Sequence, residues 1–77
     1  MTPPDLHHRL KSKGSIAIPK GMASEDALRL ARMARDWLDA VEERSAIMEY
    51  LAGHTRTNAE ALALDDNPIP QEMEILL

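Results

Sequence analysis

The sequence predicts an all-α fold built around one long amphipathic helix with short flanking helices. Apolar residues recur in sevens between Ser24 and Gly53, and neither proline nor glycine interrupts that span. Shorter segments with helix-capping residues flank it on both sides. We expect the long helix to cover about 24–52. It should pack as a helical hairpin or bundle that dimerisation completes.

Residues typical of helix boundaries stand at both ends of the long helix. The Ser24 hydroxyl is a suitable N-cap, and Glu25 and Asp26 place negative charge at the positive end of the helix dipole. Gly53 stands where a left-handed residue closes a helix. At about 1.5 Å per residue the rod is roughly 43 Å long. We therefore expect it to extend beyond a compact domain of this size.

The apolar face of the helix is wide. Its two central rows, written as heptad positions a and d, contain one charged residue, Arg44. The rows are Ala27, Ala34, Val41 and Met48, then Leu30, Trp37, Arg44 and Leu51. The flanking rows, which include Met33, Leu38 and Ile47, are also mostly apolar. A face of this width suits a helix that packs on two neighbours.

The length bounds how much of this face one chain can bury. At 77 residues, with no cysteine and no phenylalanine, the chain is a single small helical domain with a marginal core. A homodimer is the predicted remedy, with an obligate different partner as the alternative. In an antiparallel pair centred near Asp39, Leu30 would face Met48 of the second copy and Trp37 would face Val41.

Residues 1–23 form the basic amino-terminal arm. Residues 1–14 predict a short helix that Thr2 or Asp5 caps and Gly14 closes, with Leu6 and Leu10 as an apolar pair. Residues 15–23 predict an extended segment. It is either a linker, anchored by Ile16, Ile18 and Met22, or an edge strand that pairs with its symmetry mate.

Residues 54–77 form a short helix and an acidic, aliphatic tail. Thr57 and Glu60 have the spacing of a capping box, and the helix should end before Pro68. The tail, 67–77, either packs back on the long helix as a terminal turn or inserts into another protein's groove. Its large apolar residues are Ile69, Met73, Leu76 and Leu77.

Composition and spacing argue against several functions. The net charge is −4, with +3 on residues 1–20 and −7 on the rest. The helix after Gly53 has Arg56 as its one basic residue, so we do not expect nucleic acid binding. His7 and His8 diverge on a helix and cannot hold one metal together. We expect no catalytic residues, no metal and no cofactor. No apolar run reaches membrane-spanning length, so we expect a cytoplasmic protein.

The sequence thus predicts a small non-catalytic protein–protein interaction module that associates with itself. It would act as a regulator, inhibitor or adaptor of a larger protein. The alternatives are an antitoxin-like protein, with a basic DNA-binding part and an acidic toxin-binding tail, and a structural subunit of an assembly. The predicted interaction residues lie on the long helix and in the tail: Leu30, Met33, Ala34, Trp37, Leu38, Val41, Arg44, Met48, Leu51, Ile69, Met73 and Leu76.

Overall fold

The computed structural model describes residues 2–14, 16 and 18–76. These residues form four helices: α1 (Pro3–Lys13), α2 (Ser24–Tyr50), α3 (Arg56–Asp66) and α4 (Gln71–Leu76). No strand occurs among them, so the predicted all-α class is confirmed. The edge-strand alternative for residues 15–23 finds no support in the part of that segment that is described.

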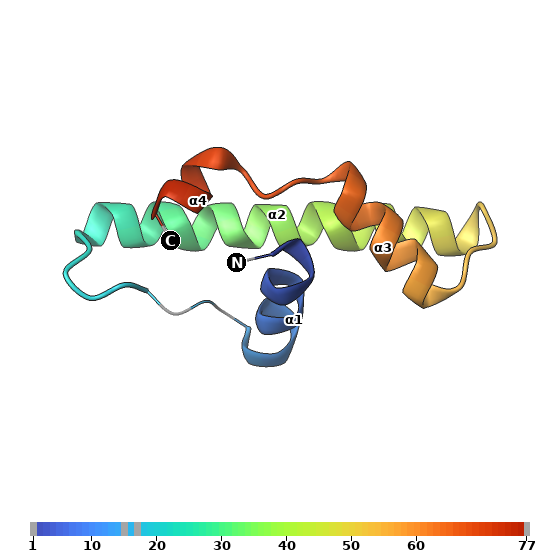
Figure 1. Cartoon of the computed structure of the whole chain (residues 1–77), viewed down its shortest axis with the longest axis horizontal. Coiled ribbons are helices and arrows are strands. Elements are labelled where there is room, and N and C mark those ends of the chain that lie inside the picture. The colour runs from blue at the N-terminus through green and yellow to red at the C-terminus, as the bar shows by residue number, and fades with distance from the viewer. Residues whose placement is uncertain (1, 15, 17, 77) are drawn as a thin grey trace.

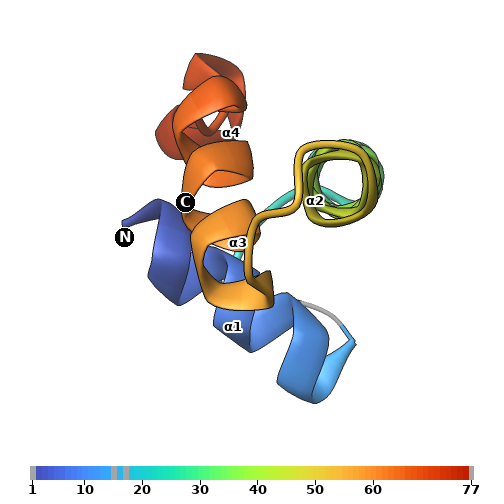
Figure 2. The same cartoon turned by 90° about the vertical axis from the view of Figure 1, so that its right-hand side faces the viewer.

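The three shorter helices all lie on one side of α2 (Figures 1 and 2). The molecule measures 45 × 21 × 17 Å. Because α2 alone spans about 40 Å at 1.5 Å per residue, this helix sets the length of the molecule. α4 lies along the first half of α2, while α3 crosses its second half (Figure 1). One flank of the rod is therefore covered by the chain itself.

The amino-terminal helix α1 begins and ends as its sequence predicts. The Thr2 hydroxyl accepts a hydrogen bond from the backbone N–H of Asp5 (3.4 Å), and the prolines occupy the first turn, where no intrahelical donor is needed. Gly14 has a φ of 75° and donates its N–H to the carbonyl of Leu10 (2.9 Å). A left-handed residue at this position satisfies a free helix carbonyl.

The amino-terminal boundary of α2 corrects one prediction. Ser24 is the first residue of the helix, and the N-cap is Ala23, which makes no side-chain cap bond. The N–H of Ala27 reaches the carbonyl of Ala23 (2.9 Å), so the first turn closes one residue earlier than expected and Ser24 takes helical geometry.

The carboxyl end of α2 lies two residues before the expected one. The helix ends at Tyr50, with Leu51 as its C-cap. Gly53 has a φ of 73°, as predicted. The N–H of His54 bonds the carbonyl of Met48 (3.2 Å), so backbone closes this turn.

The cap of α3 is also corrected. Thr55 caps this helix, accepting a hydrogen bond from the N–H of Asn58 (3.3 Å), and Thr57 lies inside the first turn. Oε1 of Glu60 lies 3.9 Å from Nε of Arg56, one helical turn earlier. The predicted end before Pro68 is confirmed, because Asn67 is the C-cap.

The core lies between α2 and the three shorter helices. α1 contributes Leu6 and Leu10, and the linker contributes Ile16, as predicted. Met22 is partly buried against the core, but Ile18 is exposed, so only part of the predicted anchor holds. The buried cluster comprises Leu6, Leu10, Ile16, Leu30, Ala34, Trp37, Val41, Ala63, Ile69 and Met73.

Candidate interaction surface

The middle of the predicted α2 seam is buried within the chain. Leu30, Ala34 and Val41 are buried, and Trp37 is only 5% exposed. These side chains pack against residues of α1, α3 and α4 in one hydrophobic cluster. The molecule therefore covers with its own short helices a surface that the sequence assigned to a second polypeptide.

Trp37 also fixes the connection between α3 and α4. Its indole Nε1–H donates to the backbone carbonyl of Asn67 (2.8 Å), and the Asn67 side chain donates from Nδ2 to the carbonyl of Ala63 (2.9 Å). The seam layers predicted between two copies, Leu30 with Met48 and Trp37 with Val41, would need side chains that are already covered. The tail folds back because the ring offers both an apolar surface and a donor to the turning backbone.

The other predicted interaction residues are buried, partly buried or exposed. Ile69 and Met73 of the tail are buried in the same core, which agrees with the packed-back alternative. Leu77 lies outside the described residues. Arg44 is exposed and forms an ion pair with Asp66 of α3 (3.0 Å). Four more residues are partly buried: Met33, Leu38, Met48 and Leu76.

Leu51 is the predicted residue that solvent reaches most. It is 82% exposed, and Ile47, one turn earlier, is 40% exposed. Beside Ile47 a hollow of about 480 Å³ runs between α2 and the end of α3. We name the hollow and Leu51 together the α2 end surface: Ala40, Glu43, Arg44, Ile47, Leu51, Asp66 and Asn67.

The charged side chains that line the α2 end surface give it a small negative net charge. Two acidic side chains, Glu43 and Asp66, and one basic side chain, Arg44, line the hollow. Arg44 is held by Asp66, so part of its charge is neutralised within the molecule. The surface thus combines aliphatic side chains with a negative rim.

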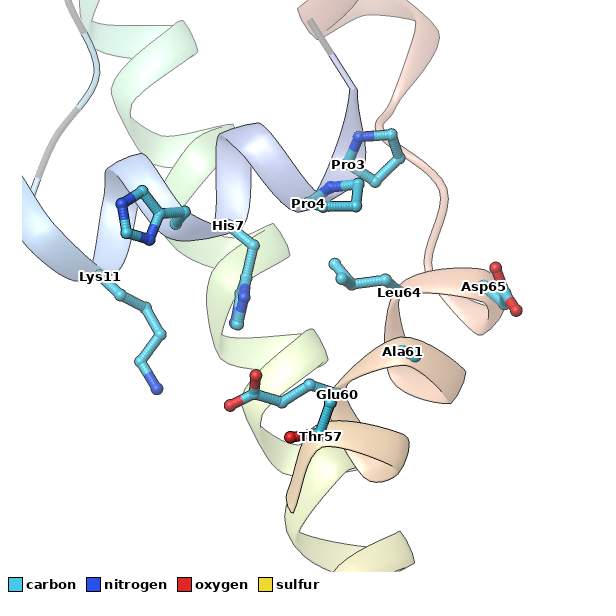
Figure 3. A pocket seen from close by; sticks show the side chains of 10 residues that line it. Pro3, Pro4, His7, Lys11, Thr57, Glu60, Ala61, Leu64 and Asp65 are labelled. Carbon is cyan, nitrogen blue, oxygen red and sulfur yellow. The ribbon is translucent and has the colours of Figure 1, made fainter. Parts of the chain in front are cut away.

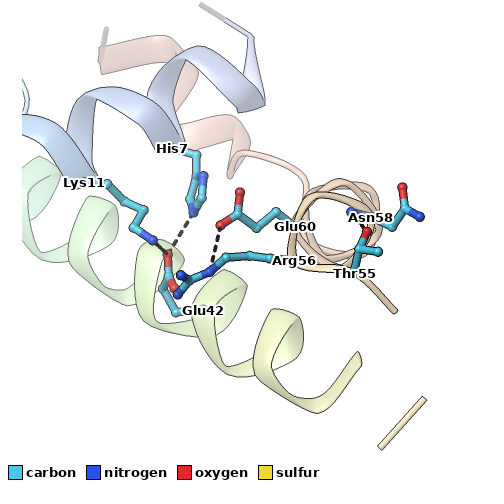
Figure 4. Close-up of polar contacts among 7 residues, drawn as sticks. All are labelled: His7, Lys11, Glu42, Thr55, Arg56, Asn58 and Glu60. Carbon is cyan, nitrogen blue, oxygen red and sulfur yellow. Dashed lines mark hydrogen bonds and ion pairs between the residues drawn. The ribbon is translucent and has the colours of Figure 1, made fainter. Parts of the chain in front are cut away.

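A polar cluster that the sequence did not reveal joins α1 to α2 (Figure 4). Nε2 of the buried His7 ring lies 2.9 Å from Oε1 of Glu42, and Nζ of Lys11 lies 3.3 Å from the same oxygen. The His7 ring also meets Trp37 edge-on at 6.4 Å. His7 and Glu42 are 35 residues apart, so no local spacing could have paired them.

The cluster changes the acidity of Glu42. Partial burial alone would raise the pKa of this carboxyl, but the hydrogen bonds from His7 and Lys11 and their charges outweigh burial. The pKa of Glu42 is therefore lowered from its ordinary value of 4.5. The groups satisfy one another, which is the arrangement of a structural contact between helices.

A second hollow, of about 580 Å³, opens between α1 and α3 (Figure 3). Pro3 and Pro4 form one wall, and Ala61 and Leu64 of α3 face them. His7 and Lys11 line it as well, but both already contact Glu42. The lining is mixed, and the contacts of His7 and Lys11 with Glu42 hold α1 in place.

Within residues 2–14, 16 and 18–76, no three or more histidine, cysteine or carboxylate side chains lie together in a metal-binding arrangement. The helices in that same part of the chain are all too short or too polar to cross a bilayer. Comparison of the chain with family models, with curated proteins and with solved structures finds no match.

Proposed function

We propose that this protein is a non-catalytic protein–protein interaction module that regulates, inhibits or adapts a larger protein through the α2 end surface. The observation that carries the proposal is the exposure of Leu51 and Ile47 next to a hollow, at the end of α2 farthest from α4 (Figure 1). Exposed large aliphatic side chains grouped in this way are typical of protein contact sites.

The charge around the surface indicates the chemistry of the partner. The hollow is lined by the acidic side chains of Glu43 and Asp66 and by the basic side chain of Arg44, which is paired with Asp66. A partner segment with one or two aliphatic anchors, flanked by lysine or arginine, would complement both the aliphatic centre and the negative rim. The tail is a weaker candidate contact, because Ile69 and Met73 are packed in the core of the same molecule.

The proposal can be tested by photo-crosslinking in the cells that make the protein. A photoreactive residue at position 51 should form an adduct with a defined partner, whereas the same residue at Thr57, exposed on α3, should not. Ile47→Glu in the position-51 chain should abolish the adduct, because a carboxylate would enter the aliphatic centre.

Binding of the purified partner completes the test. Ile47→Glu should weaken the affinity at least about tenfold, and the crosslinked partner segment should be basic and aliphatic. Equal adduct formation at Leu51 and Thr57, or unchanged affinity of the Ile47→Glu variant with its helicity intact, would overturn the proposal.

A further inference from the structure

A second surface of α2 lies opposite the core. Residues spaced three or four apart along the helix share one face, and those directed away from the core are exposed. α1, α3 and α4 lie on the other side of α2 (Figure 2). We call this the outer face: Leu28, Arg32, Arg35, Asp39, Glu43, Ala46 and Tyr50.

The outer face has a large apolar side chain near each end. Leu28 is 55% exposed and Tyr50 is 82% exposed. They are separated by 22 residues of continuous helix, which is about 33 Å. Asp39 stands midway between them.

Charge is distributed unequally along the same helix. Residues 24–35 contain three arginines and two acidic residues, whereas residues 36–50 contain five acidic residues and one arginine. The two halves of α2 therefore carry opposite net charge. Two such rods attract one another side by side when they run in opposite directions and repel when they run in parallel.

We propose that a second copy of this chain docks antiparallel on the outer face, with the two-fold axis at Asp39. Leu28 then faces Tyr50 of the second copy, and Arg35 faces its Glu43, because each pair is placed symmetrically about residue 39. The leucine covers the tyrosine ring while the charged pairs fix direction and register.

At the two-fold axis the Asp39 carboxylates of the two copies lie close together, and Arg35 of each copy supplies a counter-ion. Arg35 lies 3.6 Å from Asp39 within each copy. Two arginines and two aspartates therefore alternate around the axis. In a parallel pair Arg35 would instead stack on Arg35. The inference shares with the proposed function the role of α2 as the contact helix. It uses the outer face, which has only Glu43 in common with the α2 end surface.

Disulfide trapping of the full chain tests the geometry directly, because the sequence has no native cysteine. Under mild oxidation Asp39→Cys should crosslink to itself across the axis. Leu28→Cys and Tyr50→Cys should each fail alone and should crosslink when mixed. Thr57→Cys, exposed on α3, gives the background from random collisions, and the expected yields exceed it severalfold.

Charge exchange tests the register independently. Arg35→Glu and Glu43→Arg should each weaken dimerisation, on the order of tenfold, because symmetry affects two contacts at once. The chain with both changes should regain the wild-type affinity, as measured by analytical ultracentrifugation. Circular dichroism confirms that helix content is retained.

Three results would overturn the inference. The first is a monomer at all concentrations, and the second is a yield of Leu28→Cys homodimer equal to that of Asp39→Cys. The third is a doubly exchanged chain whose dimer affinity does not recover. None of these depends on the larger partner. An intact dimer that forms no adduct at position 51 would instead contradict the proposed function alone.

Discussion

Trp37 shows how one side chain joins burial to hydrogen bonding. Its ring lies in the core, and its indole N–H donates to the carbonyl of Asn67 at the turn into α4. Trp37→Phe keeps an aromatic ring but leaves that carbonyl without its donor, so we expect a loss of about 1–3 kcal/mol in the free energy of unfolding. Trp37→Ala should cost about 3–5 kcal/mol.

Urea unfolding followed by circular dichroism measures both losses. A Trp37→Phe variant as stable as the wild type would show that the hydrogen bond to Asn67 contributes nothing net. The difference between the two variants separates the hydrogen bond from the volume of the ring.

Glu42 makes stability depend on pH through the contact of α1 with α2. Because its pKa is lower in the folded chain than its ordinary value of 4.5, folding favours the ionised carboxylate. Its contribution is present above that ordinary value and is lost as the pH falls through the lower folded pKa. The Glu42 side chain is 39% exposed, so screening limits the contribution to at most about 1 kcal/mol.

Comparison of wild type with Glu42→Gln over a pH series tests this linkage. The wild type should be the more stable of the two at about pH 6, and the difference should shrink towards about pH 3. A difference that grows on acidification would contradict the sign. Amide exchange in α1 should become faster in the same variant, because His7 and Lys11 of that helix both contact the Glu42 carboxylate.

At the scale of elements, α4 is held mainly by one residue. Met73 is fully buried, whereas the ion pair of Glu72 with Arg29 (2.9 Å) is exposed. We expect Met73→Ala to lower the free energy of unfolding by about 2–5 kcal/mol. Ile75→Ala in the same helix, at an exposed position, should change it by less than about 0.5 kcal/mol.

Denaturant unfolding of the two variants checks this contrast. Removing the ion pair through Arg29→Ala should cost less than about 1 kcal/mol, because solvent screens exposed pairs. A larger effect of Arg29→Ala than of Met73→Ala would mean that charge, and not burial, docks α4.

For the whole molecule, the opposite charges of the two halves of α2 make the proposed dimer sensitive to salt. Raising the ionic strength from about 0.05 M to about 0.5 M shortens the screening length several-fold. The dissociation constant measured by ultracentrifugation should therefore rise, while the helix content of each chain stays constant. A dissociation constant that falls with salt would indicate an apolar interface at another surface.

The sequence alone determined where most elements lie, because helix signals are local. The seven-residue apolar spacing, the left-handed glycines at 14 and 53, and the Thr2 cap act within a few residues of themselves. The errors, at Ser24 and Thr57, are shifts of one or two residues between neighbouring capping candidates.

Only the tertiary structure decided which polypeptide covers Trp37. Either a second copy or the chain's own α3 and α4 could bury the same apolar residues, because the hydrophobic effect is non-directional. The choice depends on the turn at Gly53, which directs the following chain back along α2. It also depends on the hydrogen bond from Trp37 to Asn67, two residues that are far apart in sequence. The pairing of His7 with Glu42 arises in the same way, from helices that meet only after the chain has folded.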